Sequence, residues 1–283
     1  MDRNLRLGLI GDNIRQTRSP SLHIVCGLAS GINVAYDLLI PYEQGLPFHA
    51  LLKRCEEAGY NGLNVTYPYK ETAAKLVTPG DPMISRIGSS NTICFRPEGP
   101  RCFNTDYTGF VSAYRDRFGA TEPGRVLLIG AGGVGRAVAF GLLNLGCGRL
   151  DICDSDADKI AALSSALRGG GEEPAMQVGQ DSPKDLGNLD GYDGVINCTP
   201  LGMVGKPGSP LPPGVSGQVR WAFEAVYTPL RTTFIGQVEA LGADVLNGYE
   251  LYFHQGIQAF EHFSGVKLAD PARVRDILLN SAN

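Results

Sequence analysis

The sequence predicts an α/β protein in two parts: a mixed α/β part at the N-terminus, then a doubly wound part on a parallel sheet. Two observations carry this prediction. From residue 125 onward, short apolar segments alternate with helical ones, and continuous apolar strands are typical of parallel sheets buried on both faces. Before residue 110, the strand-like segments are short, and two of them flank the turn sequence at 97–100, which indicates an antiparallel hairpin.

The N-terminal part combines short strands with amphipathic helices. Ser19-Pro20 predicts a helix start, because proline is favoured in the first helical turn. Apolar residues recur at helical spacing along 47–58, which predicts a second helix. The expected strands are 5–10, 35–40 and 63–66, with hairpin strands at 89–95 and 101–104.

The doubly wound part follows a helix that is expected to begin at Thr105-Asp106 and a turn-rich break at 119–124. Its expected strands are 125–129, 150–153, 194–198, 221–226 and 243–246, with closing helices at 249–263 and 271–280. The segment 202–217 is rich in glycine and proline and is expected to be a loop.

Composition excludes several classes of protein. The chain has 283 residues and a net charge of −4, which argues against nucleic acid or an anionic membrane as the main partner. No apolar run approaches the roughly 18 residues that a membrane span needs, and the N-terminal segment lacks the apolar stretch of a signal peptide. The seven cysteines are dispersed without a CxxC pair, so we expect reduced thiols, no metal site and a cytoplasmic protein.

The motif GAGGVG at 130–135 directly follows the apolar strand 125–129 and opens a helical segment. In this context the pattern predicts a dinucleotide-binding loop. Gly130 permits the tight turn, Gly132 lets the backbone approach a pyrophosphate at the helix N-terminus, and Gly135 lets the helix pack on the strand. Asp154 ends the next strand about 20 residues later, where an acidic residue binds the ribose hydroxyls. The alternative is a tight turn with a capping aspartate.

Asp154 also favours NAD over NADP. A carboxylate accepts hydrogen bonds from a free 2′-hydroxyl and repels a 2′-phosphate. The segment 153–158 holds three aspartates and no arginine, although Arg149 and Lys159 are nearby in the sequence. The predicted cofactor-binding residues of this loop are Gly130, Ala131, Gly132, Gly133, Val134, Gly135 and Asp154.

Several polar clusters in the N-terminal part end or flank strands, and later motifs follow in order. They are TRSPSLH at 17–23, NVTYPYK at 64–70, SSNT at 89–92, NTD at 104–106, NCTPLGM at 197–203, AVYTPL at 225–230 and GYELYFHQ at 248–255. Together with GAGGVG, this series resembles the shikimate dehydrogenase family, which includes quinate dehydrogenases, over almost the whole chain. The resemblance implies a catalytic domain at 1–110 completed by helices at 248–283, and a Rossmann dinucleotide-binding domain at 111–247.

The resemblance also assigns roles to residues. Lys70 and Asp106 would be the catalytic pair, Lys70 exchanging the hydroxyl proton and Asp106 binding the same hydroxyl. The substrate-binding residues would be Thr17, Ser19, Asn64, Thr66, Asn91, Tyr227 and Gln255, with the first two holding a carboxylate. Further cofactor contacts would come from Thr199, Met203, Val226 and Gly248. Each has an ordinary alternative, such as a solvated lysine, a helix-capping aspartate or a core tyrosine, and the joint match favours the functional interpretation.

The chain departs from the usual family pattern at three places. Thr17 stands where shikimate dehydrogenases usually have serine, Ser89-Ser90 replaces a small apolar pair, and Asp154 leads an acidic segment in place of an NADP-type Asn-Arg-Thr. We therefore expect an NAD-preferring enzyme, with NADP less favoured, that oxidises the ring hydroxyl of shikimate or quinate to the 3-dehydro ketone. It would act on this small-molecule substrate as a monomer or homodimer.

Three alternatives stay open at this point. One is a related enzyme that acts on a similar ring such as aminoshikimate. Another is a dinucleotide-binding regulator without turnover. The third is a different two-domain dehydrogenase, such as a methylene-tetrahydrofolate or amino-acid enzyme, against which the motifs at 64–70 and 104–106 argue.

Overall fold

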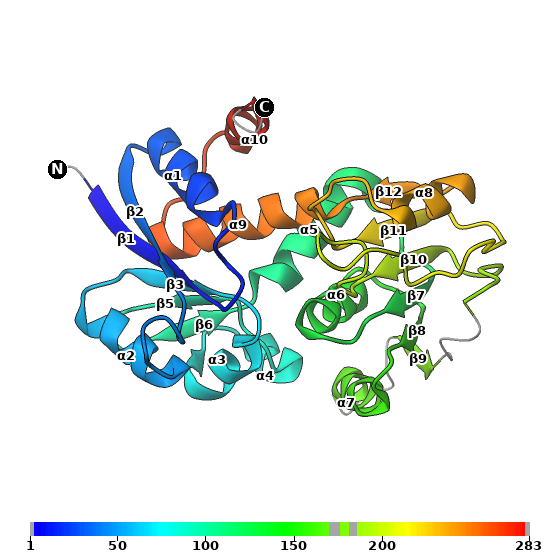
Figure 1. The fold of residues 1–283 in the computed structure, drawn as a ribbon, viewed down its shortest axis with the longest axis horizontal. Coiled ribbons are helices and arrows are strands. Elements are labelled where there is room, and N and C mark those ends of the chain that lie inside the picture. The colour runs from blue at the N-terminus through cyan, green and yellow to red at the C-terminus, as the bar shows by residue number, and fades with distance from the viewer. Residues whose placement is uncertain (1–2, 170–175, 181–185, 281–283) are drawn as a thin grey trace. The chain divides into compact units, whose positions relative to one another are not determined.

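The computed structural model describes residues 3–169, 176–180 and 186–280, and the chain forms two compact units (Figure 1). The first unit comprises Met1–Thr105 and Phe253–Asn283, and the second comprises Asp106–Tyr252. Each unit is built on its own six-stranded sheet, and the predicted α/β class is confirmed. The two unit boundaries fall within helices α5 (Thr105–Phe118) and α9 (Gly248–Ser264).

The first unit has a mixed sheet with strand order β2-β1-β3-β5-β6-β4. Its strands are β1 (Arg3–Ile10), β2 (Ile32–Leu39), β3 (Gly62–Val65), β4 (Thr78–Pro79), β5 (Thr92–Cys94) and β6 (Arg101–Phe103). Strand β1 pairs in parallel with both β2 and β3, and β3, β5 and β6 pair antiparallel, so the predicted hairpin is present. Its helices are α1 (Ser19–Ala29), α2 (Phe48–Glu57), α3 (Lys70–Leu76), α4 (Pro82–Ile87) and α10 (Pro271–Asn280), together with the C-terminal part of α9.

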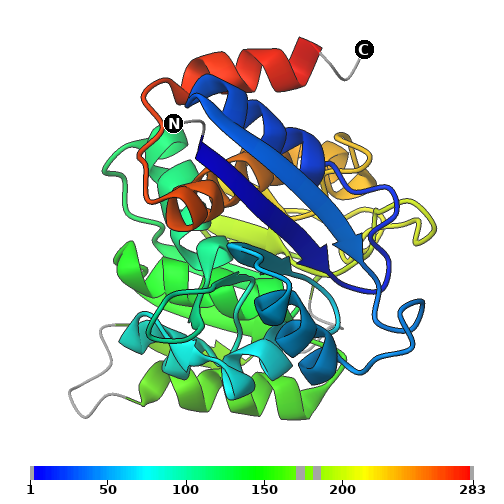
Figure 2. The same ribbon diagram turned by 90° about the vertical axis from the view of Figure 1, so that its left-hand side faces the viewer.

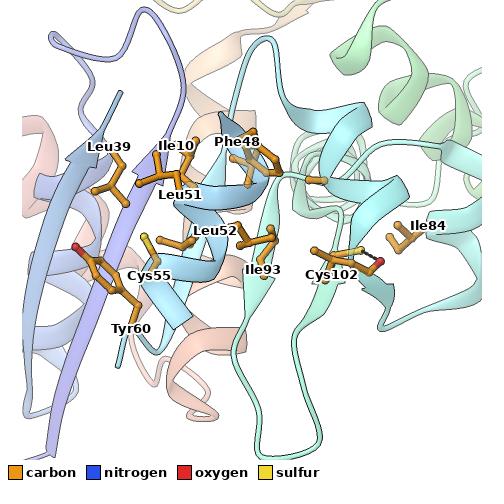
Figure 3. Packing of buried hydrophobic residues seen from close by; sticks show 14 residues of the cluster. Ile10, Leu39, Phe48, Leu51, Leu52, Cys55, Tyr60, Ile84, Ile93 and Cys102 are labelled. Atoms are coloured by element: carbon orange, nitrogen blue, oxygen red, sulfur yellow. Dashed lines mark hydrogen bonds between the residues drawn. The ribbon is translucent and has the colours of Figure 1, made fainter. Parts of the chain in front are cut away.

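The two faces of this sheet carry different helices. Ile10, Leu39 and Leu63 pack with the apolar face of α2. Figure 3 shows Ile10 and Leu39 next to this helix. The alternate residues of the strands face α1 and α9, because side chains alternate across a strand. On that face, a Cβ built on Gly62 would lie 2.2 Å from the Phe263 ring of α9, so only glycine permits this close approach. Figure 2 shows β1 and β2 side by side, with α1 alongside them and α10 next to α1.

The second unit has an entirely parallel sheet with strand order β12-β11-β10-β7-β8-β9. Its strands are β7 (Arg125–Ile129), β8 (Arg149–Cys153), β9 (Gln177–Gln180), β10 (Gly194–Asn197), β11 (Trp221–Glu224) and β12 (Asp244–Leu246), and its helices include α6 (Gly133–Asn144), α7 (Ala157–Arg168) and α8 (Thr233–Ala240). The order reverses between β7 and β10, which is the topological switch point of a doubly wound fold. Its central strands β7, β10 and β11 are buried except at Arg125, the first residue of β7.

Some element bounds differ from the sequence-based expectations. The strand expected at 221–226 ends at Glu224, whose side chain accepts a hydrogen bond from the Val226 amide and so turns the chain out of the strand. The hairpin strand expected at 89–95 begins at Thr92, because Ser89 and Ser90 are held by side-chain hydrogen bonds instead. Helices α3 and α4 and strand β9 were not predicted, since each is too short to show a clear period.

Helices long and apolar enough to cross a membrane are absent from the described residues.

Candidate active site

Polar residues predicted to bind substrate gather at the carboxyl edge of the parallel strands of the first unit. Strand β1 ends at Ile10 and β3 ends at Val65, and these two residues are direct partners in the register. The Thr66 amide donates to the Ile10 carbonyl (2.9 Å), and a Cβ on Gly11 would lie 2.3 Å from the Thr66 methyl group. The chain leaving β1 therefore passes directly against the chain leaving β3. Such an edge is where open α/β sheets bind ligands.

Thr17 and Ser19 form a hydroxyl pair in the loop that leads from β1 into α1. Their oxygens lie 3.0 Å apart, and the Ser19 amide donates to the Thr17 hydroxyl oxygen (3.2 Å). Both residues are half-buried. Helix α1 begins at Ser19 with Pro20 in its first turn, as predicted. The pair presents two hydroxyl groups at a helix N-terminus, an arrangement that suits an anionic ligand such as a carboxylate.

Lys70 is the first residue of α3 and is half-buried. Its carbonyl accepts a hydrogen bond from the Ser90 amide (2.9 Å), and the Asn91 carbonyl accepts one from the Val65 amide (2.8 Å). These two backbone contacts bring the NVTYPYK and SSNT motifs together. The first unit thus joins Asn64, Thr66, Lys70 and Asn91, which are separated in the sequence.

The Asn91 side chain is buried, and its carbonyl oxygen is occupied by the start of helix α5 and by Thr92 of β5. It accepts hydrogen bonds from the Thr105 amide (2.7 Å), the Thr105 hydroxyl (3.2 Å) and the Thr92 hydroxyl (3.0 Å). Its amide group donates to Gln255 Oε1 (3.4 Å), so two predicted substrate residues are in contact. Asp106, the second residue of α5, is buried and follows Thr105 directly. Asn91 therefore fixes the backbone immediately before Asp106.

The two serines that depart from the family pattern are fully buried with their hydroxyl groups satisfied. Ser90 Oγ donates to the Phe103 carbonyl (2.7 Å). Asn104 Nδ2 donates to both the carbonyl (2.9 Å) and the hydroxyl oxygen (3.1 Å) of Ser89. The substitutions from apolar residues therefore leave no unpaired hydroxyl, because the neighbouring hairpin supplies the partners.

The glycine loop of the second unit has a tight turn at Gly130 and close packing at Gly135. Gly130 has a φ of 101°, a left-handed backbone conformation that favours glycine. A Cβ on Gly135 would lie 1.9 Å from the Gly130 carbonyl oxygen, so helix α6 packs too closely on the loop for a side chain. A Cβ on Gly132 would meet nothing within 4 Å. The loop thus leaves open space where a pyrophosphate would approach the N-terminus of α6, and the residues fit a bound dinucleotide.

Asp154 joins the second strand of the Rossmann sheet to the glycine loop. Its Oδ2 accepts from the Ala131 amide (2.7 Å) and its Oδ1 from the Asp156 amide (3.0 Å). These bonds orient the carboxylate next to the loop. The nearby cations are engaged elsewhere: Lys159 lies 3.6 Å from Asp156, and Arg149 donates to Asp151 (3.0 Å) at the opposite end of β8.

A buried polar network that sequence reasoning missed supports the NCTPLGM loop. Glu224 is completely buried at the end of β11 and accepts from Asn197 Nδ2, the Val226 amide (3.0 Å) and Thr232 Oγ1 (2.7 Å). Asn197 in turn accepts from the amide (2.9 Å) and hydroxyl (2.7 Å) of Thr199 and donates to the Leu201 carbonyl (3.1 Å). Burial raises the pKa of Glu224, and these hydrogen bonds oppose the rise. Asn197 and Glu224 are polar residues at the ends of two apolar strands that pair in the sheet, and this pattern could have indicated the network.

The remaining predicted residues of the second unit lie at or near the carboxyl ends of its strands. Met203 is exposed in the loop after β10, and Val226 is buried just after β11. Tyr227 is half-buried and its ring stacks on Tyr252, with centroids 5.2 Å apart. A Cβ on Gly248 would lie 2.5 Å from the Ala225 carbonyl oxygen, so glycine is needed where α9 begins.

The second unit has a doubly wound sheet with this glycine loop, and the first unit has a polar strand edge. This combination is typical of an NAD(P)-dependent oxidoreductase, and the similar proteins belong to the same class. The sequence model of the family described as shikimate dehydrogenase substrate binding domain matches residues 9–93. Quinate/shikimate dehydrogenase (NAD(+)) of Corynebacterium efficiens is 32% identical over 98% of both chains, and shikimate dehydrogenase (NADP(+)) of Pseudarthrobacter chlorophenolicus is 34% identical over 96% of this chain and 94% of its own.

Solved structures agree with these relatives. Quinate dehydrogenase from Corynebacterium glutamicum in complex with NAD has a TM-score of 0.90 at 29% identity, covering 99% of this chain and 100% of its own. Shikimate 5-dehydrogenase from Thermus thermophilus in complex with NADP(H) and shikimate has a TM-score of 0.82 at 27% identity, covering 98% and 99%. The chain belongs to the shikimate dehydrogenase family, and the resemblance stated from its motifs is confirmed.

Proposed function

We propose that the protein is an NAD-preferring dehydrogenase that oxidises the ring hydroxyl of quinate or shikimate to the 3-dehydro ketone. The observation that carries the proposal is the convergence of Asn64, Thr66, Lys70 and Asn91 at one edge of the first unit's sheet. Hydroxyl, amide and ammonium groups gathered in this way suit a small ring that carries several hydroxyls. The relatives named quinate/shikimate dehydrogenase and shikimate dehydrogenase support the same choice.

The substrate carboxylate is assigned to Thr17 and Ser19. Their two hydroxyls lie 3.0 Å apart and can both donate to one carboxylate, with the N-terminus of α1 behind them. The ring hydroxyls are assigned to Asn64, Thr66 and Asn91, with Gln255 and Tyr227 as further contacts. In Asn91 the carbonyl oxygen is already occupied, so its amide hydrogens are the groups that would face a ligand.

The proton that leaves the substrate hydroxyl is assigned to Lys70. A positioned acid or base typically contributes about 10²–10⁴-fold to the rate. Asp106 would accept a hydrogen bond from the same hydroxyl, and Asn91 supports it by holding the Thr105 backbone directly before it. The bound nicotinamide supplies the hydride acceptor, so this chain's residues need only bind, orient and move a proton.

The preference for NAD rests on Asp154. Its carboxylate is oriented by two backbone amides and would accept from the ribose hydroxyls. A 2′-phosphate at that position needs a cation, and Lys159 and Arg149 are held by other carboxylates. The resemblance to a quinate dehydrogenase that binds NAD supports this preference.

The test is a two-by-two assay in which shikimate or quinate is offered with NAD or NADP and NADH or NADPH formation is followed by absorbance. We expect turnover with NAD on at least one acid, and the ratio of kcat/KM values names the substrate. Turnover with NADP alone would overturn the cofactor preference and keep the family chemistry. A blank result with saturable NAD binding would favour a related ring, such as aminoshikimate, or a regulator without turnover.

Two further features complete the proposal. The protein is expected in the cytoplasm as a monomer or homodimer, which size-exclusion chromatography with light scattering would measure. The seven cysteines, all of which lie in the described residues, form no disulfide, and burial raises the pKa of Cys198 in the NCTPLGM loop, which makes this thiol less reactive.

A further inference from the structure

A hydrogen bond links the predicted substrate residue Asn64 to a tyrosine on another strand. Tyr36 lies on β2 and its hydroxyl donates to Asn64 Oδ1 (2.9 Å) across the intervening strand β1. In the register, Tyr36 pairs with Leu7 and Asn64 pairs with Leu9, two residues on the same face of β1. Both side chains therefore lie on the face that is covered by α1 and α9.

The Tyr36 ring is held by two sets of contacts. It packs against the small cluster of Leu9, Ile14 and Ile40. It also stacks on the His23 imidazole of α1, with ring centroids 5.1 Å apart and an interplanar angle of 14°. The phenol is thereby fixed in direction, and so is the hydrogen bond that its hydroxyl makes to Asn64.

His23 is also buried. The imidazole is 2% exposed and lies between Tyr36 and the Phe263 ring of α9. Burial lowers the pKa of His23 to about 4. The ring is therefore neutral at neutral pH and carries one N–H.

We propose that Tyr36, held by the His23 ring stacked on it, is a positioning residue that keeps the Asn64 amide with its oxygen turned inward, so that its NH₂ group faces the ring substrate as a donor. The inference rests on the proposed function, in which Asn64 binds a ring hydroxyl. The Tyr36 hydroxyl donates to the amide oxygen, so this oxygen is engaged and the NH₂ group stays available. The site would then recognise a ring oxygen as an acceptor at this position.

The first test is Tyr36→Phe, which keeps the stacked ring and removes only the hydroxyl. Loss of one hydrogen bond of this kind is expected to raise KM for the ring acid by about tenfold. The KM for NAD should stay unchanged and kcat should change less than KM, because neither cofactor nor reacting proton is touched. Tyr60→Phe is the matched control, since Tyr60 donates to Asp37 in the same unit and lies away from Asn64. Equal KM values in the Tyr36 variant and the wild type would overturn the inference.

The His23 side chain is tested by rescue. His23→Phe retains a flat ring that can stack on Tyr36, whereas His23→Leu retains only volume. We expect KM for the ring acid to rise clearly more in His23→Leu than in His23→Phe, with equal NAD binding in both. Equal effects of the two variants would show that the stacked ring does not hold Tyr36 in place.

A readout independent of turnover separates this inference from the proposed function. The side-chain ¹⁵N–¹H₂ resonances of Asn64, assigned by comparison with Asn64→Asp, report the orientation of its amide. We expect one well-resolved pair in the wild type and a shifted or exchange-broadened pair in Tyr36→Phe, with Tyr60→Phe unchanged. An enzyme inactive on ring acids that still shows this change would refute the function and keep the positioning. An unchanged Asn64 signal in an active enzyme would refute the positioning.

Discussion

Glu224 and Asn197 end two adjacent strands of the Rossmann sheet and are joined by hydrogen bonds from one amide to both carboxylate oxygens, at 2.9 and 3.1 Å. Through Asn197 this contact reaches Thr199 in the NCTPLGM loop, and through Thr232 it reaches the start of α8. A single buried carboxylate therefore supports two of the segments at the carboxyl edge of this sheet.

Glu224→Gln tests that support. The new amide would set an NH₂ group against the donors on Asn197 or Val226, and a buried donor left unpaired costs about 1–3 kcal/mol. We expect the free energy of unfolding in urea to fall by this amount, with a raised KM for NAD. Glu239→Gln is the control, because Glu239 forms a largely exposed ion pair with Arg231, worth about 0–1 kcal/mol. A Glu224 variant as stable as this control would contradict the network.

Lys70→Ala tests the proton transfer. We expect kcat to fall by about 10²–10⁴-fold, since a positioned acid or base is lost, while NAD binding measured by fluorescence titration stays within a factor of two or so. Lys75→Ala is the matched control, because Lys75 is exposed on the same helix. A Lys70 variant with near-normal kcat would remove this residue from the mechanism.

Asp154→Asn tests the cofactor preference. The amide oxygen can still accept from Ala131, but the charge that repels a 2′-phosphate is gone. We expect the ratio of kcat/KM for NAD to that for NADP to fall by about tenfold or more, in line with loss of a hydrogen bond to a charged group. Asp276→Asn, on the exposed side of α10, should leave the ratio unchanged. An unaltered ratio of kcat/KM values in the Asp154 variant would mean that another group distinguishes the 2′-hydroxyl of NAD from the 2′-phosphate of NADP.

Gly135→Ala tests the close packing of α6 on the glycine loop. The added methyl would lie 1.9 Å from the Gly130 carbonyl oxygen, so the loop must move. We expect a loss of about 1–3 kcal/mol in unfolding free energy and weaker NAD binding by calorimetry. Gly236→Ala on α8 is the control: a Cβ there meets nothing, and alanine should stabilise the helix by about 0.5–1 kcal/mol. Similar unfolding free energies and NAD affinities for both variants would argue against close packing of α6 on the glycine loop at Gly135.

His23 makes the stability of the protein depend on pH. Its pKa is about 4 in the folded protein against an ordinary value of 6.5, because burial disfavours the charged form. Between these values the unfolded chain binds a proton that the folded one does not, so acidification lowers stability. This stability is fully present above pH 6.5 and is lost as the pH falls through 4, and the difference corresponds to about 3 kcal/mol.

The measurement compares urea unfolding of the wild type and His23→Gln from pH 7 to pH 4. We expect the wild type to lose up to about 3 kcal/mol more than the variant over this range. His49→Gln, at an exposed position, should follow the wild type. Parallel curves for wild type and His23→Gln would show that His23 does not become protonated on unfolding in this window.

The fold class and the cofactor loop could be predicted because their signals are local. Buried parallel strands are continuous apolar segments. The glycines at 130, 132 and 135 lie within six residues, and their spacing is the pattern of a tight, closely packed loop. Short elements such as α4 and β9 escaped prediction, because too few residues show a period. The roles of Lys70 and Asp106 came from the joint match of motifs and stay predictions.

The sequence by itself determined the family, the two sheets and the kinds of polar group that the site contains. Only the tertiary structure decided which atoms of those groups are engaged. Tyr36 and Asn64 are 28 residues apart, and Glu224 and Asn197 are 27 apart, so no local pattern joins them. A buried polar atom must find its partner among whatever residues packing brings near, and that choice is made across strands and not along the chain.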